Sequence, residues 1–168
     1  MVQKKICMLG ATAVGKTSLV ARYVRNLFSE KYHSSIGVKV DKKVLSAGGR
    51  EMTLLLWDIY GDDEFQKIRT SYLRGASGYL LVVDGTRRST LDRALEVRKS
   101  VEEAIGQVPF ILVVNKADLV DEWDMPEDLE GRFRNEGWDV IRSSAKTGVG
   151  VEEAFSGLAA KLAAGEKA

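Results

Sequence analysis

The stretch GATAVGKT, residues 10–17, decides the fold because it joins an apolar run to a helical pattern. The apolar run KKICMLG (4–10) predicts a buried strand. Residues 16–27 predict a helix, whose apolar face carries Leu19, Val20, Tyr23, Val24 and Leu27. The stretch itself fits the pattern G-x-x-x-x-G-K-[ST], which between a strand and a helix predicts a loop that cradles phosphate groups.

Each part of this loop has a physical role in the predicted cradle. Gly10 and Gly15 permit a backbone path that turns several N–H groups toward an anion, next to the positive end of the helix dipole. Lys16 would place its charge on the outer phosphates, and Thr17 would offer a hydroxyl to Mg²⁺. The nucleotide-binding residues expected here are Thr12, Ala13, Val14, Gly15, Lys16, Thr17 and Ser18. A glycine-rich turn without function is the alternative, and the cradle alone does not identify the nucleotide.

Strands and helices alternate along the rest of the chain. The expected strands are 4–10, 38–45, 52–58, 78–85, 109–116 and 138–145. The second is polar on one side, as an edge strand is, and a hairpin turn at 46–51 joins it to the third. The strands 78–85 and 109–116 are apolar on both faces, as in the centre of a parallel sheet, and a last helix is expected at 149–163. This order predicts a three-layer α/β fold in one domain, residues 1–168, with ligands at the carboxyl ends of the strands.

The composition is ordinary for a soluble globular domain, with 45% apolar and 29% charged residues. The net charge of +1 gives no reason to expect nucleic acid or an anionic membrane as a partner, and the pair Arg87–Arg88 is too short to indicate nucleic acid. Cys7, the single cysteine, excludes an internal disulfide and suggests a reducing compartment. The sequence has no Ser/His/Asp or Cys/His set and no zinc spacing, which excludes the enzyme classes that need them.

Two further loops follow predicted strands and indicate which base the nucleotide carries. NKAD (115–118) ends in Asp118, whose carboxylate suits a ring N–H beside an exocyclic amine, the edge that guanine presents and adenine does not. In SAK (144–146) the Ala145 N–H would donate to a guanine oxygen, and the two lysines of these loops would cover the base. The expected base-binding residues are Asn115, Lys116, Asp118, Ser144, Ala145 and Lys146. An ATP-binding enzyme with the same cradle is the less favoured alternative.

Acidic residues follow the strand 52–58 in the stretch WDIYGDDEF (57–65). Asp58 ends that strand beside the cradle, where a carboxylate would hold Mg²⁺ through water, because Mg²⁺ keeps several of its waters. Gly61 would offer its backbone N–H to a terminal phosphate without obstruction from a side chain. Asp63 and Glu64 are typical of a solvated helix start, where acidic groups favour the helix dipole.

These motifs together resemble those of the small GTPases of the Ras superfamily, nearest to the Rab-like branch. The resemblance is carried by GATAVGKT, SSIGV (34–38), WDIYG (57–61), NKAD and SSAK (143–146). It implies a six-stranded, mostly parallel mixed sheet with five helices, GTP and GDP binding with Mg²⁺, and slow GTP hydrolysis. Two switch loops, at about 29–39 and about 59–75, would change shape with the γ-phosphate and signal to protein effectors. A GTPase-activating protein and an exchange factor are implied as regulators.

The resemblance also assigns roles to single residues. Phe28 matches the aromatic residue that packs against guanine, and Tyr32 matches the one that closes over the phosphates. Ser35 falls on the switch I threonine that ligates Mg²⁺ in the GTP state. The expected metal ligands are Thr17, Ser35 and Asp58. Thr12 falls beside the γ-phosphate, where Rab-like members tolerate a small hydroxyl residue.

Switch II departs from the family pattern Thr-Ala-Gly-Gln-Glu, because the chain has IYGDD (59–63) there. Asp62 replaces the glutamine that orients the attacking water. At about 4 Å and an effective dielectric near 20, an ionised carboxylate and a phosphate oppose each other by about 4 kcal/mol per unit charge, so very slow hydrolysis is expected. The expected catalytic residues are Lys16, Gly61 and Asp62. A nucleotide-binding interaction module with little or no hydrolysis is the alternative, favoured by Ser35, Tyr60 and Asp62.

The ends of the chain carry no targeting signal. MVQKK is not a myristoylation signal, KLAAGEKA has no cysteine to lipidate, and no stretch approaches the roughly 20 apolar residues that span a bilayer. No lipid anchor and a cytoplasmic location are therefore expected. A prokaryotic source fits this ending, as does a chain trimmed before its tail or a domain of a longer protein.

Overall fold

The computed structural model of the chain describes residues 2–28, 37–60 and 70–165. In this part of the chain six strands form one sheet, in the order β2-β3-β1-β4-β5-β6. The strands are β1 (Val2–Gly10), β2 (Gly37–Ala47), β3 (Arg50–Tyr60), β4 (Gly78–Asp84), β5 (Phe110–Asn115) and β6 (Val140–Arg142). The β2–β3 pair is antiparallel, and the other four neighbouring pairs are parallel. The predicted six-stranded, mostly parallel mixed sheet is confirmed.

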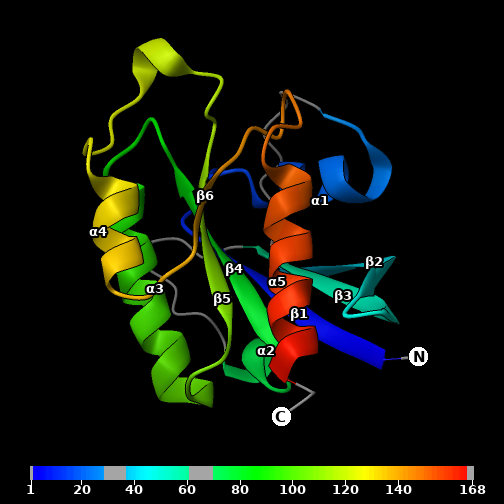
Figure 1. Cartoon of the computed structure of the whole chain (residues 1–168). Coiled ribbons are helices and arrows are strands. Elements are labelled where there is room, and N and C mark those ends of the chain that lie inside the picture. The colour runs from blue at the N-terminus through cyan, green and yellow to red at the C-terminus, as the bar shows by residue number, and fades with distance from the viewer. Residues whose placement is uncertain (1, 29–36, 61–69, 166–168) are drawn as a thin grey trace.

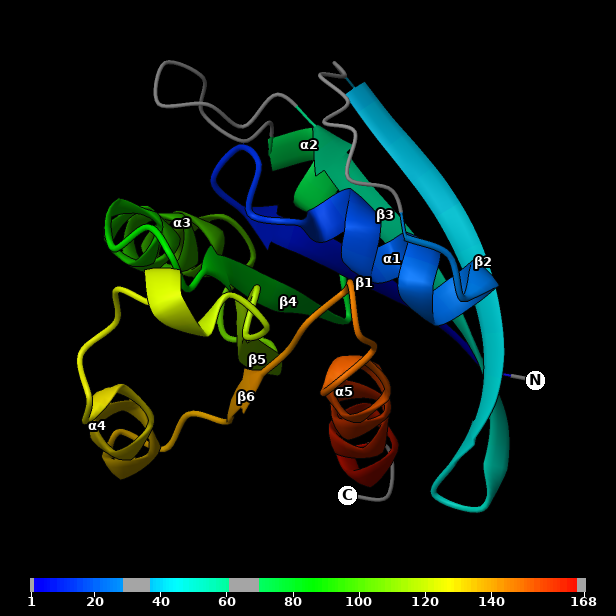
Figure 2. The same ribbon diagram turned by 90° about the horizontal axis from the view of Figure 1, so that it is seen from above.

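Helices cover both faces of this sheet, which gives three layers (Figures 1 and 2). The helices are α1 (Lys16–Arg25), α2 (Thr70–Leu73), α3 (Ser89–Ile105), α4 (Leu129–Asn135) and α5 (Val151–Gly165), with a short 3₁₀ turn η1 (Val120–Glu122). Helices α1 and α5 pack on one face, and α2, α3 and α4 pack on the other. The predicted three-layer arrangement with five helices is confirmed for the residues described.

The side chains of β4 explain why the sheet is covered on both faces. The strand is buried along its whole length, and successive side chains point to opposite faces. Leu80 and Val82 belong to the core under α1 and α5, whereas Tyr79, Leu81 and Val83 belong to the core under α3. Burial of one large apolar side chain contributes roughly 1.5–3 kcal/mol, so a strand that is apolar on both faces favours a place between two helical layers.

The antiparallel β2–β3 hairpin forms one edge of the sheet. Gly48 and Gly49 connect the strands with φ of 62° and 77°, values that a two-residue hairpin turn requires and that glycine adopts without steric cost. Val40 and Val44 of β2 remain 48% and 45% exposed, as expected of an edge strand with one open face. The predicted hairpin and its place at the edge are confirmed.

Several predicted boundaries are wrong, and two of them have a clear local cause. The first helix ends at Arg25 instead of residue 27, because Asn26 adopts the left-handed conformation, with φ of 54°, and its N–H bonds back into the last turn. Leu27 is therefore exposed and does not belong to the buried face of the helix. The last strand covers only Val140–Arg142, because the N–H of Ser144 already bonds to a carbonyl in the following loop.

The carboxyl ends of the central strands meet at one edge of the sheet, the upper edge in Figure 1. Gly10 at the end of β1 lies opposite Val82 of β4, and Asp84 at the end of β4 lies opposite Asn115 at the end of β5. The loops that carry the predicted motifs leave the sheet at this edge. The parallel register therefore brings segments distant in sequence into one place.

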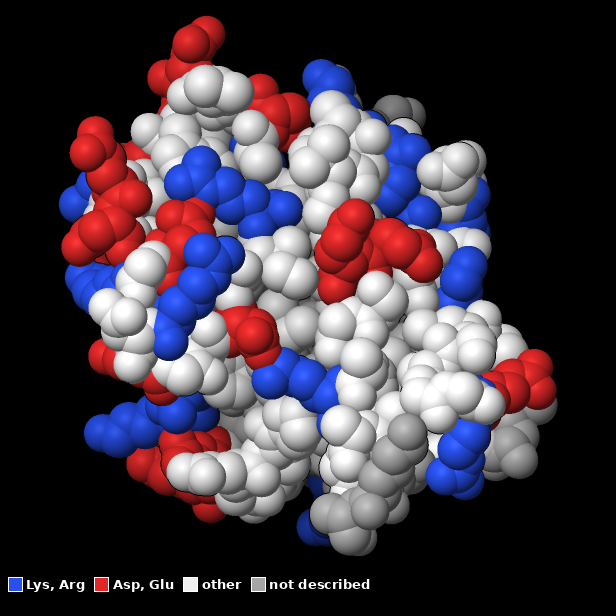
Figure 3. Space-filling model, in the orientation of Figure 1, with Lys and Arg blue, Asp and Glu red and all other residues white. Residues whose placement is uncertain are grey.

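The surface is consistent with the balanced charge of the chain. Acidic and basic side chains are interspersed over the face shown in Figure 3. Among the residues that the structure describes, no helix combines the length and the apolar character needed to cross a membrane.

Candidate functional site

The phosphate-cradle loop follows a backbone path that requires its two glycines. Gly10, Ala13 and Gly15 have φ of 146°, 63° and 107°. A Cβ on Gly10 would lie 2.3 Å from the carbonyl oxygen of Val82, and a Cβ on Gly15 would lie 2.2 Å from Nδ2 of Asn115. Backbone conformation and the neighbouring strands therefore both exclude a side chain at these two positions.

Lys16 begins α1 and extends its side chain back along this loop. Its Nζ donates to the carbonyl of Gly10 at 2.8 Å, and the residue is only 8% exposed. The first turn of α1 carries no acidic residue, so no acid on that turn opposes the positive end of the helix dipole. A buried cation and a helix N-terminus thus lie at the same loop, an arrangement that favours an anion.

Thr17 and Asp58 bring a hydroxyl and a carboxylate together near the carboxyl end of β3. Thr17 Oγ1 donates to Asp58 Oδ2 at 2.6 Å, and Asp58 is 1% exposed. These oxygen donors suit Mg²⁺, which needs only one or two protein ligands because phosphate oxygens and water complete its coordination. The described residues hold no group of three or more His, Cys, Asp or Glu side chains placed to bind a metal. The pair therefore fits a magnesium ion shared with a phosphate ligand.

Asn115 connects three segments of the site from the end of β5. Its Nδ2 donates to the Val14 carbonyl at 3.0 Å, and its Oδ1 accepts from Ser143 Oγ at 3.1 Å and from the Ala145 N–H at 3.3 Å. The side chain is buried, which strengthens these bonds because water does not compete for them. One amide thus holds the NKAD loop, the cradle and the SSAK loop together.

Asp118 and Ser144 face each other across the two predicted base-binding loops. Ser144 Oγ donates to Asp118 Oδ1 at 2.7 Å and accepts from the Thr147 N–H at 3.1 Å. An ionised carboxylate offers about four acceptor positions. The bond from Ser144 therefore orients Asp118 and leaves it able to accept two further N–H groups.

Asp84 is a residue of this edge that the sequence analysis did not identify. It ends β4, is 1% exposed, and accepts hydrogen bonds from Thr86, Arg87 and Lys116. Burial alone would raise the pKa of Asp84, but the hydrogen bonds from these three residues outweigh burial and hold the pKa below its usual value. The sequence did contain a signal, because Asp84 is an acid at the end of the predicted strand 78–85, as Asp58 is at the end of the predicted strand 52–58.

Two cations connect Asp84 to the cradle loop. Lys116 Nζ lies 2.9 Å from Asp84 Oδ2 and donates to the Ala13 carbonyl at 3.1 Å. Arg87 Nε donates to Asp84 Oδ2 at 2.9 Å, and its Nη2 donates to the Thr12 carbonyl at 2.8 Å. Arg87 and Thr12 are 75 positions apart, and no periodic pattern in the sequence indicates their contact.

Arg22 makes a similar connection on the opposite side of the cradle. From the last turn of α1, its Nε donates to the Ala145 carbonyl at 2.7 Å, and its Nη2 donates to the Lys146 carbonyl. Its Nη1 donates to Asn26 Oδ1 at 2.9 Å, which fixes the guanidinium. The helix that begins with Lys16 therefore also holds the SSAK loop.

The remaining predicted residues are placed as follows. Phe28 ends the first described segment and is 36% exposed. The Val14 side chain is buried in the core under α1 and α5, so this residue reaches the interior of the loop only through its backbone. Several predicted residues lie outside the described part of the chain, with most of the two switch ranges: Tyr32, Ser35, Gly61 and Asp62.

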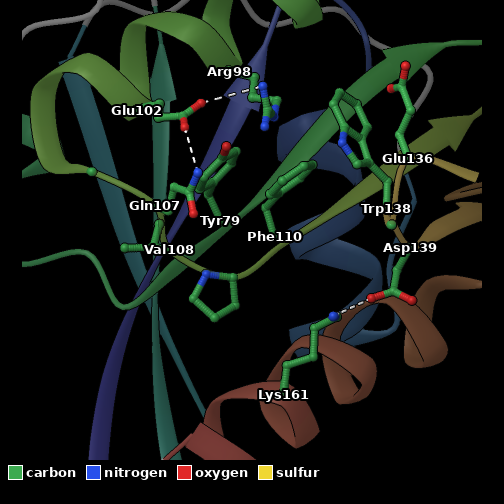
Figure 4. A pocket seen from close by; sticks show the side chains of 13 residues that line it. Tyr79, Arg98, Glu102, Gln107, Val108, Phe110, Glu136, Trp138, Asp139 and Lys161 are labelled. Atoms are coloured by element: carbon green, nitrogen blue, oxygen red, sulfur yellow. Dashed lines mark hydrogen bonds and ion pairs between the residues drawn. The ribbon is translucent and has the colours of Figure 1, made fainter. Parts of the chain in front are cut away.

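A cavity of about 260 Å³ lies at the opposite end of the sheet, near the amino ends of β4 and β5 (Figure 4). Its wall contains the aromatic side chains of Tyr79, Phe110 and Trp138. The Arg98 guanidinium lies 4.8 Å from a ring centroid of Trp138 and 3.5 Å from the Glu102 carboxylate, and Lys161 pairs with Asp139. These groups pair with one another, which accounts for the packing here without identifying a ligand.

The sequence of the chain matches a model of the Ras family over residues 5–164. It is 36% identical over 156 residues to the Ras-related protein RABA4a of Arabidopsis thaliana, an alignment that covers 90% of this chain and 68% of that protein. It is 32% identical over 157 residues to the Ras-related protein Rab-13 of Bos taurus, covering 92% of this chain and 77% of that protein. It is 35% identical over 162 residues to the Ras-related protein Rab-32C of Dictyostelium discoideum, covering 92% and 70%. The chain has the predicted six-stranded α/β fold and the predicted glycine-rich loop at residues 10–17. Together with these matches, this shows that the chain belongs to the Ras family and is a Rab-like small GTPase, a GTP-binding molecular switch.

Proposed function

We propose that the chain, as one G domain over residues 1–168, binds GTP and GDP with Mg²⁺ at the carboxyl edge of its sheet. The observation that supports this most is the convergence at one edge of the cradle loop 10–17, the Thr17–Asp58 pair and the Asp118 carboxylate held by Ser144. The loop suits phosphates, the pair suits Mg²⁺, and the carboxylate suits the amine edge of guanine. Titration of the nucleotide-free protein with GDP and with ADP in the presence of Mg²⁺ tests the proposal, and ADP binding as tight as GDP binding would contradict it.

The base is recognised in this proposal by two loops that the structure brings together. Asp118 accepts from the ring N–H and the exocyclic amine of guanine, and the Ala145 N–H donates to the guanine oxygen. That N–H lies 3.3 Å from Asn115 Oδ1 in the present structure, a long contact that a ligand oxygen can share or replace. Lys116 and Lys146 cover the base through the apolar stems of their side chains.

The metal is held in this proposal by Thr17, Asp58 and Ser35. When bound, Mg²⁺ supplies positive charge to the phosphate oxygens. Because Thr17 Oγ1 donates its proton to the buried Asp58, the lone pairs of the hydroxyl stay available for the ion.

GTP hydrolysis is slow in this proposal, because Asp62 occupies the position of the water-orienting glutamine. Every ~1.4 kcal/mol added to the barrier slows the reaction tenfold, and repulsion between like charges about 4 Å apart at an effective dielectric near 20 is about 4 kcal/mol per unit charge. Asp62→Gln should therefore raise the single-turnover rate of GTP hydrolysis by about tenfold or more. The matched control Asp63→Asn removes a neighbouring charge and should leave the rate unchanged. A rate for Asp62→Gln equal to that of the wild type would show that Asp62 is not the cause.

A second candidate function is a nucleotide-binding interaction module with little or no hydrolysis. The sequence features that favour it are Ser35, Tyr60 and Asp62. Analysis of the nucleotide carried by the purified protein separates the two candidates. Retained GTP, with no turnover in either the wild type or Asp62→Gln, supports the module, and retained GDP supports the hydrolysing switch.

The proposed partners are protein effectors, a GTPase-activating protein and an exchange factor. Val40 directly follows switch I and Val44 lies further along β2, and both expose apolar side chains that an effector can bury. A cytoplasmic location remains part of the proposal.

A further inference from the structure

We propose that Arg87, anchored on the buried carboxylate of Asp84, is a positioning residue that orients the Thr12–Ala13 peptide toward the distal phosphate of a bound nucleotide. This inference rests on the proposed function. It adds to the site a residue that lies outside the five motifs on which the resemblance depends.

Three consecutive carbonyls of the cradle loop accept hydrogen bonds from side chains outside the loop. The carbonyls of residues 12, 13 and 14 accept, in this order, from Arg87 at 2.8 Å, from Lys116 at 3.1 Å and from Asn115 at 3.0 Å. The peptide bonds of the described residues are all trans. In a planar trans peptide the carbonyl and the following N–H point in opposite directions. Bonds that hold these carbonyls therefore turn the next three N–H groups away from the side chains, into the anion-binding interior of the loop.

Arg87 bridges Asp84 and the loop with two nitrogens of one rigid plane. Its Nε donates to Asp84 Oδ2 at 2.9 Å and its Nη2 to the Thr12 carbonyl at 2.8 Å. Asp84 is itself fixed, because its Oδ1 accepts from the N–H and the hydroxyl of Thr86 at 2.9 and 2.7 Å. Lysine keeps the charge but replaces the planar fork with a single nitrogen on a flexible stem. The bridge therefore depends on the shape of arginine and not on its charge alone.

The order of the three contacts indicates which part of the nucleotide Arg87 serves. Asn115 and Lys116 belong to the loop proposed to bind the base, and they hold the carbonyls of residues 14 and 13. Arg87 comes from the connection between β4 and α3, and it holds residue 12, the next one away from the base-binding contacts. The peptide that Arg87 orients should therefore matter most for the phosphate farthest from the base.

The competing interpretation is an exposed ion pair with little effect, since the Arg87 side chain is 44% exposed and surface ion pairs contribute little. Two observations oppose it: the carboxylate partner is almost fully buried, and the second acceptor is a backbone carbonyl of the cradle. The difference between the two interpretations is measurable, because a surface ion pair has no reason to distinguish GTP from GDP.

The test measures the dissociation rates of GDP and of a non-hydrolysable GTP analogue, with Mg²⁺, from the wild type, Arg87→Met and Arg87→Lys. Loss of one hydrogen bond corresponds to about two- to tenfold, so the GTP analogue should dissociate faster from both variants by about this factor. The GDP rate should change by less than about twofold. Arg88→Met is the matched control, because the neighbouring arginine pairs with Asp124 at 3.6 Å on the surface, and both rates should equal those of the wild type.

Equal acceleration of both nucleotides by Arg87→Met, or none, overturns the inference. Wild-type rates in Arg87→Lys also overturn it, because charge alone would then be sufficient. Thermal unfolding of both variants checks that the fold is retained, and the lysine variant decides the matter if the methionine variant does not fold. A wild-type protein that binds neither nucleotide contradicts the proposed function, and the inference then fails with it, whereas normal binding with unaltered variants contradicts the inference alone.

Discussion

The proposed phosphate side and the proposed base side of the site keep their recognition groups in position by different means. On the phosphate side these groups belong to the backbone, and side chains from other elements hold them through the carbonyls of residues 12–14. On the base side the proposed recognition group is the carboxylate of Asp118, which the hydroxyl of Ser144 orients. Backbone N–H groups suit a phosphate of any nucleotide, whereas an oriented carboxylate suits one edge of one base.

This difference predicts two kinds of variant. A substitution on the phosphate side should weaken nucleotides that carry the same phosphates alike, whatever their base, and one on the base side should change the ratio between nucleotides that differ in the base. GDP and IDP distinguish the two kinds, because IDP lacks the exocyclic amine and is otherwise the same molecule. The affinity ratio of GDP to IDP therefore tests whether the two sides are as separate as their contacts indicate.

Lys16→Ala should give the largest effect. The ammonium group is almost buried in the cradle loop, and a charge interaction of about 4 kcal/mol with the phosphates corresponds to about 10³-fold in affinity. Equilibrium titration should show GDP and IDP weakened by about this factor, with their ratio unchanged. Lys99→Ala, which removes an exposed lysine of α3, should bind both as the wild type does. A changed ratio in Lys16→Ala would mean that the cradle also influences base recognition.

Asp118→Asn should give the next largest effect, about 10- to 100-fold for GDP, because a hydrogen bond to a charged group is worth about 1.5–3 kcal/mol. The amide can accept at only one of its two terminal atoms, so it cannot pair with the ring N–H and the amine together. IDP lacks the amine and should lose less, which brings the ratio of GDP to IDP toward one. Asp121→Asn, at an exposed acid of η1, is the control. Equal weakening of both nucleotides would show that Asp118 does not pair with the amine.

The fold could be predicted where the deciding property is local. The apolar runs of β4 and β5 and the paired glycines of the hairpin are visible in the sequence, and the sheet follows from them. The end of α1 could not be predicted, because Leu27 continues the helical pattern while Asn26 leaves the helix through a left-handed conformation. A periodic pattern reports which faces are apolar and does not report the conformation of a single residue.

The site could be predicted where a contiguous motif carries it, as in the loop 10–17 and in NKAD. The roles of Arg87 and Arg22 were missed because their contacts with residues 12 and 145 join segments that only the folded chain brings together. Asp84 was missed although its place at the end of a central strand was a signal. The sequence around Arg87 does not show that its partner is the carbonyl of residue 12. The binding roles of the motif residues themselves stay predictions, and the nucleotide titrations are what tests them.

Arg22→Gln should give the smallest effect. It tests the one contact on the base side that is proposed to come from the backbone, the Ala145 N–H. Arg22 donates from α1 to the carbonyls of Ala145 and Lys146 and so holds the loop whose N–H is proposed to meet the guanine oxygen. Glutamine is shorter and has one donor group, so about one hydrogen bond is lost, and GDP should dissociate about two- to tenfold faster. Arg25→Gln, which loses an ion pair with Asp41 on the same helix, should leave the rate unchanged.

The affinity ratio of GDP to IDP decides how the result for Arg22→Gln is interpreted. Both nucleotides carry the base oxygen, so their dissociation should accelerate equally and the ratio should stay that of the wild type, although the residue lies on the base side. A lowered ratio would show that the loop also transmits its position to Asp118 through Ser144, since Ser144 immediately precedes the residues that Arg22 holds. Recognition of the guanine oxygen by the Ala145 N–H and of the guanine amine by Asp118 would then be coupled within one loop. Only the contacts to the phosphates would then be independent of base recognition.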